Sequence, residues 1–246
     1  MRVRALLLTA ALLVPGCGGG SGPTDPPTPR EILIVGLARR DRSPVQSLEG
    51  YLAFFYDRDA ETLLSAAPVV NGRPVDQEFQ PGIVPGPGYS EGINVEPGQL
   101  YQLTAEVTRP GHGTIEVTSA QVLIPSELEI EVPEEVQAGS PLTVSWSVTG
   151  AQMVNVAVEA VFSEHVPASQ GMFTIPASAF ADRPAGQEVE VEITAYNTFY
   201  EPLGAAISTL SDAQAAAEKF RGIDNVEGGV GVFGGAFTLG EIVTVR

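Results

Sequence analysis

Apolar and polar residues alternate with a period of two in many short segments after residue 30. The alternation is most regular over residues 101–107 and 142–148, and Gly- or Pro-containing turns separate such segments. A period of two buries one face of a strand and leaves the other face in water, so the pattern predicts antiparallel β-strands. Many short strands with frequent turns are typical of β-sandwiches, and we expect a mainly β protein.

Residues 31–125 predict a first β-sandwich domain. A β-branched apolar run at residues 32–35 opens it as a strand. The dipeptide Asn71-Gly72 lies between two apolar segments, which is a hairpin signal. Tyr101 begins a late strand, at the place where sandwich domains often carry a corner tyrosine.

The alternation restarts after Pro125, so residues 126–246 predict a second β-sandwich domain. Several short strands with intervening turns over roughly 80 residues are typical of immunoglobulin-like or fibronectin-type sandwiches. The only tryptophan, Trp146, is in phase with the apolar residues of its strand, which predicts that it is buried in this second core. The architecture expected from the pattern is therefore two tandem sandwiches.

One helix interrupts the β pattern near the C-terminus, at about residues 211–221. Ser211 is a favourable N-cap, Gln214 stands at the capping-box position, and Gly222 follows as a stop. Two final strands, at about residues 226–233 and 237–245, would then rejoin the second sandwich, with the helix packed near the glycine-rich first of them.

The N-terminal residues 1–16 have the order of an export signal: basic residues, an uncharged apolar run, then a small residue. The apolar run is too short to span a bilayer as a helix, which takes about 20 residues. Cys17 follows directly, and residues 17–30 form a Gly-, Pro- and Ser-rich stretch that predicts a flexible tether. The sequence Val14-Pro15-Gly16-Cys17 resembles the lipobox of bacterial lipoproteins, in which the cysteine is lipidated and holds the protein on a membrane. Gly18 stands where an Asp commonly retains lipoproteins in the inner membrane, so we expect the outer membrane, with either a periplasmic or a surface-facing position.

Charge and cysteine content narrow the function classes. The signal contains two of the 13 basic residues and none of the 30 acidic ones, so its removal changes the formal net charge from −17 to −19. Nucleic acid is then an unsuitable partner, because phosphate contacts need clustered Lys and Arg. Cys17 is the only cysteine, so the lipidated chain would have neither a disulfide nor a free thiol.

Two sequence motifs with known chemistry occur, and their context argues against both. Residues 88–92 fit the G-x-S-x-G pattern around Ser90, but a nucleophile elbow needs a strand before the serine and a helix after it. The only candidate bases, His112 and His165, are expected in exposed loops. Residues 229–234 fit G-x-G-x-x-G, but a dinucleotide site needs that run to open a helix, and here strand-forming residues follow it.

Metal binding is also disfavoured by residue spacing. The acids of residues 57–61 and the pair Glu134-Glu135 offer oxygen ligands for calcium, but neither has the spacing of a calcium loop. No His, Cys and Asp set has zinc spacing. We therefore expect no metal, no cofactor and no catalytic residues.

The segment from Asn225 to Ala236, preceded by Ile223-Asp224, resembles the closing motif of a family of bacterial outer-membrane lipoproteins that carries the domain of unknown function 4249. In that family an Asn-Ile-Glu-Gly-Gly-type run leads into Gly-x-Phe-Gly-Ala. The lipobox and the run Gly98–Leu103, which is similar to a Gly-x-x-Tyr-x-Leu strand, agree with the resemblance. The family is often encoded beside TonB-dependent receptors, which implies an outer-membrane receptor as partner and implies no binding residue.

Together these features predict a lipid-anchored cell-envelope protein that is not an enzyme and serves as a binding or accessory module. The family resemblance implies that it serves a TonB-dependent uptake receptor. A surface adhesion or glycan-binding module is the main alternative. A serine hydrolase that uses Ser90 is a further alternative of lower weight.

Overall fold

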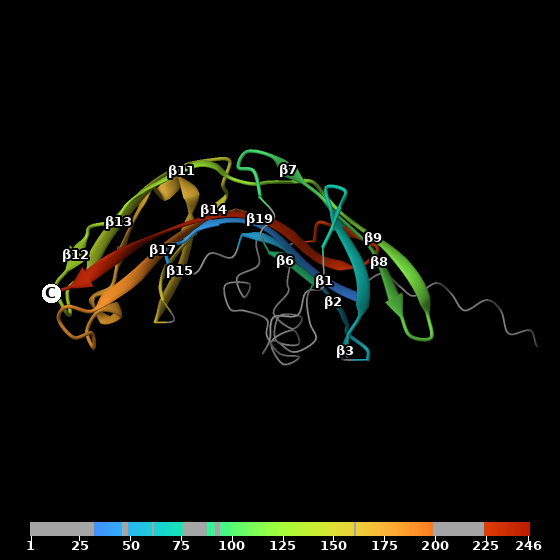
Figure 1. Ribbon diagram of the computed structural model, residues 1–246, viewed down its shortest axis with the longest axis horizontal. Coiled ribbons are helices and arrows are strands. Elements are labelled where there is room, and N and C mark those ends of the chain that lie inside the picture. Colours follow the sequence, from blue (N-terminus) through green and yellow to red (C-terminus); the bar gives the residue numbers. More distant parts are fainter. Residues whose placement is uncertain are drawn as a thin grey trace, which may run out of the picture.

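The computed structural model describes residues 32–45, 49–60, 62–75, 88–91, 94–159, 161–198 and 224–246 of the protein. These residues form a mainly β structure of several sheets, which confirms the prediction of a mainly β protein. The predicted helix at residues 211–221 lies outside the described residues, as do the signal and the tether. Figure 1 shows that the strands build an elongated arch. The described elements are β1 (Ile32–Arg42), β2 (Gly50–Asp57), β3 (Thr62–Leu63), β4 (Ser65–Val70), β5 (Arg73–Pro74), β6 (Gly88–Glu91), β7 (Leu100–Tyr101), β8 (Leu103–Arg109), β9 (Gly113–Ser119), β10 (Val122–Leu123), β11 (Ser126–Glu131), β12 (Glu135–Val136), β13 (Leu142–Thr149), β14 (Met153–Val158), β15 (Phe162–Pro167), the short 3-10 helix η2 (Ala168–Gln170), β16 (Met172–Ile175), the 3-10 helix η3 (Ala177–Ala179), β17 (Glu188–Asn197), β18 (Val226–Glu227) and β19 (Val230–Val245).

One nine-stranded sheet runs along the whole arch (Figure 1). Its strands follow the order β15-β14-β17-β19-β1-β2-β3, with β6 paired to β2 and β12 paired to β19. The first strand of the fold, β1, lies in the middle of this sheet, parallel to β19 and antiparallel to β2. A strand covered on both faces needs a continuous apolar run, and residues 32–38 of β1 are all buried.

The last strand, β19, connects the two halves of the molecule. Its residues 230–239 pair with β1, and its residues 235–244 pair with β17 on the other edge. The sequence predicted two separate strands here, both in the second sandwich, and this is wrong. The Gly234-Gly235 pair suggested a break between two strands, but both residues lie within β19. Their missing side chains let the backbone of neighbouring segments approach, since a Cβ on Gly234 would lie 2.6 Å from the Thr198 carbonyl oxygen.

The smaller sheets complete each half. A five-stranded sheet, β18-β9-β8-β4-β5, faces the first part of the long sheet, and a three-stranded sheet, β11-β13-β16, faces the second part. The predicted hairpin at Asn71-Gly72 is confirmed: both residues have positive φ, 48° and 76°, and they join β4 to β5. Both residues of a type I′ turn need positive φ, and Asn and Gly tolerate it best.

Two hydrophobic clusters lie between these layers. The first draws on residues between Ile32 and Ile124 together with Val226 and Phe233, and the second on residues between Leu128 and Val245. Trp146 is 6% exposed within the second cluster, so its predicted burial is confirmed. β19 contributes Phe233 to the first cluster and Phe237 to the second. The division of the chain into domains 31–125 and 126–246 stays a prediction, and the pairing of β1 with β19 joins the halves through one sheet.

Candidate functional site

The residues for which the sequence suggested chemistry are spread over the molecule. Cys17 lies outside the described residues. Ser90 lies in β6, and its backbone pairs with Tyr51 of β2. Both Ser90 and Glu91 belong to the strand, whereas a nucleophile elbow needs a helix that begins directly at the serine.

The two histidines have different surroundings. His112 is exposed in the turn between β8 and β9, as expected. The expectation that His165 lies in an exposed loop is wrong, because it is half-buried in β15. Its Nδ1 lies 2.8 Å from the Tyr196 hydroxyl, and its Nε2 lies 3.2 Å from the Asn155 amide nitrogen. β15 and the strand of Ser90 lie at opposite sides of the long sheet, six strand spacings or about 28 Å apart along it, so His165 cannot serve as a base for Ser90.

Most of the G-x-G-x-x-G run lies in strand β19, and the run is followed by more of this strand and not by a helix. Gly231 is the register partner of Ile34 in the parallel β1–β19 pair. A Cβ on Gly231 would collide with the Ile34 carbonyl oxygen, and one on Gly229 would lie 2.9 Å from the Ile32 carbonyl oxygen. The glycines therefore allow close packing, as predicted, but the element packed against them in the described residues is β1.

The segment that carries the family resemblance forms a tight loop from β18 into β19. The Asn225 side chain donates from Nδ2 to the Phe233 carbonyl at 2.9 Å and accepts the Phe233 N–H at 2.8 Å. The Asp224 carboxylate accepts the N–H groups of Val226 and Gly231 at 3.3 and 3.2 Å. These side chains form the hydrogen bonds that backbone groups of the loop and of β19 require, so their role is structural.

A surface pocket of about 560 Å³ lies beside this loop. Gln102, the β9 residues 118–119, Ala120 and residues 224–227 line it. The Gln102 amide is already bonded to the Ser119 carbonyl at 2.8 Å, and Asp224 is held as described above. The pocket is therefore a surface depression whose polar lining residues include groups that hold the strands together.

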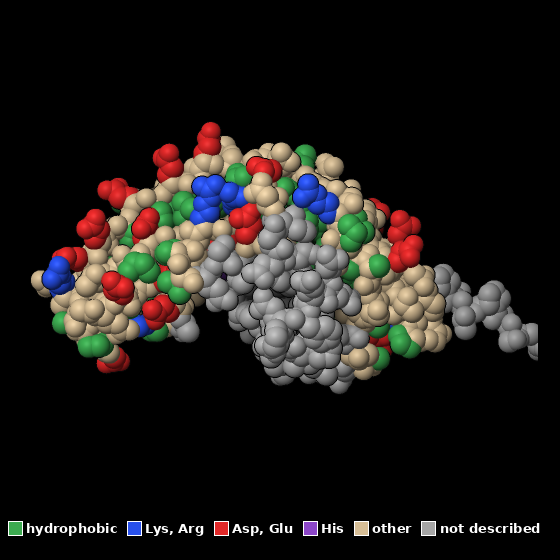
Figure 2. All heavy atoms as spheres, in the orientation of Figure 1, with side chains coloured by type: hydrophobic (Ala, Val, Ile, Leu, Met, Phe, Trp, Pro, Cys, Tyr) green, Lys and Arg blue, Asp and Glu red, His purple; other side chains and the backbone are tan. Residues whose placement is uncertain are grey.

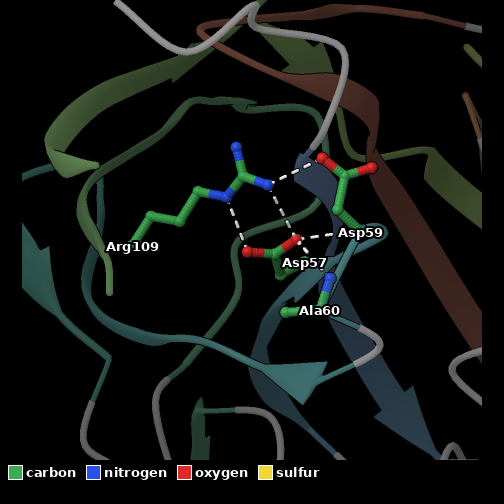
Figure 3. A network of polar contacts seen from close by, with 4 residues as sticks. All are labelled: Asp57, Asp59, Ala60 and Arg109. Carbon is green, nitrogen blue, oxygen red and sulfur yellow. Dashed lines mark hydrogen bonds and ion pairs between the residues drawn. The ribbon is translucent and has the colours of Figure 1, made fainter. Parts of the chain in front are cut away.

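A buried ion pair, Arg109 with Asp57, and the exposed Asp59 form the Arg109 network (Figure 3). Arg109 donates from Nε to Asp57 Oδ2 at 2.6 Å and from Nη2 to Asp57 Oδ1 at 3.1 Å and Asp59 Oδ2 at 2.8 Å. Asp57 Oδ1 also accepts the backbone N–H groups of Asp59 and Ala60, each at 3.0 Å. The arginine comes from the end of β8 and the aspartates from the end of β2, so the network joins the two sheets of the first half.

The electrostatics of the Arg109 network favour an ionised Asp57. Burial alone raises the pKa of Asp57, but the hydrogen bonds from Arg109, Ala60 and Asp59 outweigh burial and lower its pKa below the ordinary value. Both carboxylate oxygens of Asp57 are occupied by these donors. Asp57, the first possible calcium ligand of residues 57–61, is thus bound to Arg109 instead. Across the described ranges, no group of three or more His, Cys, Asp or Glu side chains is placed to hold a metal ion.

A second group of charges, the junction cluster, lies where β1 leaves the long sheet. It comprises Arg39, Arg40, Asp41, Glu49, Glu190 and Glu192. Arg39 pairs with Asp41 at 2.8 Å, and Arg40 pairs with Glu49 at 2.6 Å. Burial raises the pKa of Glu192; the charge of Arg39 opposes this effect, and the charges of Glu190 and Asp41 add to it. The positive charges of this cluster are matched by its own acids.

Two strands at the edge of the second half, β15 and β16, carry apolar side chains that are incompletely buried. Large exposed hydrophobic residues in the described part of the chain are Val45, Leu100, Val161 and Met172. Val161 and Met172 each precede a half-buried phenylalanine, and the rings of these two, Phe162 and Phe173, stack with centroids 5.9 Å apart. Sequence reasoning missed this contact, because β15 and β16 belong to different sheets and only the packing of one sheet on the other places Phe162 beside Phe173.

Comparisons with known proteins do not add to the site. No family model matches the chain, and no curated protein matches it. Within the described ranges, no helix has the length and apolar character needed to cross a bilayer.

Proposed function

We propose that this protein is a lipid-anchored, exported binding or accessory module of the bacterial cell envelope, held on the outer membrane through Cys17 and without catalytic activity. The observation that carries the proposal is the order of the N-terminus: a basic start, an apolar run, the lipobox-like residues 14–17 and a Gly- and Pro-rich tether. Two β-sandwich units of immunoglobulin or fibronectin type follow the tether.

The position of β1 suits a tethered role. Residues 18–31 span at most about 50 Å when fully extended, so they hold the start of β1 within that distance of the anchor. β1 is hydrogen-bonded along both edges, to β19 and to β2. A pull on the tether therefore acts on a strand in the centre of the sheet, which is well suited to carry it.

The two-layer packing of both halves supports the sandwich assignment. In the first half, the Tyr101 hydroxyl accepts a hydrogen bond from the Glu96 N–H at 2.8 Å, five residues upstream. This is the backbone contact of a tyrosine corner. In the second half, Trp146 packs between the sheets, as the core tryptophan of immunoglobulin-like domains does.

An outer-membrane receptor of the TonB-dependent class is the partner that we propose, and the resemblance of residues 225–236 to the lipoprotein family supports it. Such a partner needs a protein-binding surface on this chain. The edge of the second half, where Phe162, Met172 and Phe173 are incompletely buried, offers such a surface. No specific observation favours glycan binding, since the large exposed hydrophobic side chains among the described residues are aliphatic or Met.

Cell fractionation of a Cys17→Ser variant tests the anchor. We expect the wild type in the outer-membrane fraction, and the variant either released or retained as an uncleaved precursor. Ser21→Ala in the tether is the matched control and should fractionate like the wild type. A processed Cys17→Ser protein that stays in the membrane fraction would show that the anchor is elsewhere. Co-purification of a β-barrel receptor with the wild type from solubilised membranes tests the partner.

A further inference from the structure

We propose that the open edge of the second half, formed by β15, η2 and β16, binds an extended basic segment of a partner protein as an added strand beside β16. This inference rests on the proposed role as a binding module and specifies the surface and the partner's chemistry.

The second core has unequal layers. Strands β12, β14, β15, β17 and β19 of the long sheet enclose it on one side, and only β11, β13 and β16 enclose it on the other. β16 is the terminal strand of the smaller sheet, paired with β13 from Leu142↔Ile175 to Ser145↔Met172. A terminal strand presents backbone N–H and C=O groups that another chain can pair with, and at this edge the added strand would displace the Gln170 side-chain amide, which donates to the Met172 carbonyl at 2.9 Å.

The side chains at this edge are apolar and incompletely covered. Phe162 of β15 and Phe173 of β16 stack across the two sheets at 5.9 Å and are only half-buried. Met172 is 54% exposed and Val161 is 57% exposed. A strand added beside β16 would place its inward side chains over the two phenylalanine rings and its outward side chains beside Met172, so it would bury all three at once.

The charge around the edge selects the partner. Residues 126–182 of this half contain no Lys or Arg and eight Asp or Glu residues, of which Glu159 pairs with Arg183 and Glu135 with Arg246. Exposed Glu164 lies on β15. Glu127, Glu129 and Glu131 are exposed residues of β11, on the outer face of the smaller sheet. Figure 2 shows acidic side chains along the outer rim of this half of the arch. A second copy of this chain brings the same negative charge to the contact, so a segment that alternates apolar and basic residues is the complementary occupant.

The surroundings of Trp146 provide a local reporter of binding. Its indole N–H donates to the Ala168 carbonyl at 3.0 Å, and its backbone N–H donates to the Gly171 carbonyl at 2.9 Å. Both acceptors flank the connection between β15 and β16. The single indole N–H resonance in an NMR spectrum therefore reports changes at the open edge.

The experiment titrates the mature protein in detergent with a short synthetic peptide of alternating Lys and Val, and with a matched peptide of alternating Glu and Val. We expect the Lys-Val peptide to shift the Trp146 indole resonance and the β16 amide resonances, with an affinity that falls as salt is added. Met172→Lys should weaken this binding about tenfold, which corresponds to about 1.4 kcal/mol. Leu100→Lys, the same change at a similarly exposed site of the other half, should leave it unchanged.

Several results would overturn the inference: no shift with the Lys-Val peptide, equal binding of the Glu-Val peptide, or equal behaviour of the two Lys variants. Concentration-dependent dimerisation that Met172→Lys abolishes would identify a second copy as the occupant instead. None of these outcomes changes the fractionation of Cys17→Ser, so failure of the edge and failure of the anchor are distinguishable.

Discussion

At the residue scale, the buried ion pair between Arg109 and Asp57 has a structural role. Arg109 and Asp57 have side chains 4% and 3% exposed, and they bond in a two-point arrangement. A buried ion pair contributes little compared with a well-packed apolar pair, but the loss of one member leaves a charge without compensation. The pair therefore acts as a strong constraint on the position of β2 relative to β8.

Asp57→Asn should lower the free energy of unfolding by up to about 3–5 kcal/mol, because the guanidinium of Arg109 then loses its buried counter-charge and keeps only the exposed carboxylate of Asp59. Asp59→Asn is the matched control: it alters a carboxylate on the same arginine, but the Asp59 side chain is 61% exposed. An exposed pair contributes at most about 1 kcal/mol, so this control should change little. Urea unfolding followed by circular dichroism measures both, and equal effects of the two variants would contradict the assignment of Asp57 as the buried partner.

The same pair predicts a pH dependence. The folded protein holds the pKa of Asp57 below its unfolded value of about 3.9, so Asp57 contributes its stabilisation above that value. The contribution is lost as the pH falls through the lowered folded-state pKa, because the unfolded state binds the proton first. The difference in unfolding free energy between wild type and Asp57→Asn should be largest at neutral pH and should shrink below about pH 4. A difference that stays constant down to pH 2 would argue against the ionised pair.

At the element scale, β19 joins the two halves of the fold, and its glycines allow the neighbouring backbone to pack closely against it. Most of its central residues are buried, and it is the only described strand that pairs with elements of both halves along two edges. A glycine in such a strand allows neighbouring backbone to approach where a Cβ would collide. The run that has the pattern of a nucleotide loop is thus a packing device between β19 and β1.

Gly231→Val should destabilise the protein by at least about 1–3 kcal/mol, because the new side chain collides with the Ile34 backbone, which has no room to move within the sheet. Gly240→Ala in the same strand is a milder control, since its Cβ would meet chiefly the flexible end of the Glu190 side chain, at 2.7 Å. Thermal unfolding of the two variants measures the difference. An unchanged melting temperature for Gly231→Val would contradict the packing role, and stabilisation of the wild type by added nucleotide would support a nucleotide site.

At the scale of the whole molecule, two hydrophobic clusters share one sheet. Phe233 and Phe237 are four residues apart in β19, yet they belong to different clusters. Loss of order in one half removes the pairing partner of β19 in that half. We therefore expect the halves to unfold together.

Leu103→Ala tests this coupling, because Leu103 is fully buried in the first cluster while the only tryptophan is in the second. The substitution should cost about 2–5 kcal/mol, and it should shift the urea midpoint of Trp146 fluorescence by the same amount as that of circular dichroism. Val45→Ala, at a residue that is 67% exposed, should shift neither. A Trp146 midpoint that stays at the wild-type value while circular dichroism shows two steps would mean that the halves are independent.

The sequence by itself determined the properties that depend on neighbouring residues. The period of two predicted the mainly β class and the burial of Trp146, and Asn71-Gly72 predicted its turn, because strand faces and turn conformations are set by residues close together in the chain. The same local patterns predict the anchor at Cys17, which the described residues do not reach.

Only the tertiary structure decided the properties that depend on residues far apart in the chain. The parallel pairing of β1 with β19 joins segments about 200 residues apart, and no periodicity specifies which strand a buried apolar strand will choose as its neighbour. For the same reason the Arg109–Asp57 pair, the position of His165 and the stacked rings of Phe162 and Phe173 were not predictable. Charge and hydropathy give each residue its preference for burial, but the partner that satisfies a buried group is chosen by packing in three dimensions.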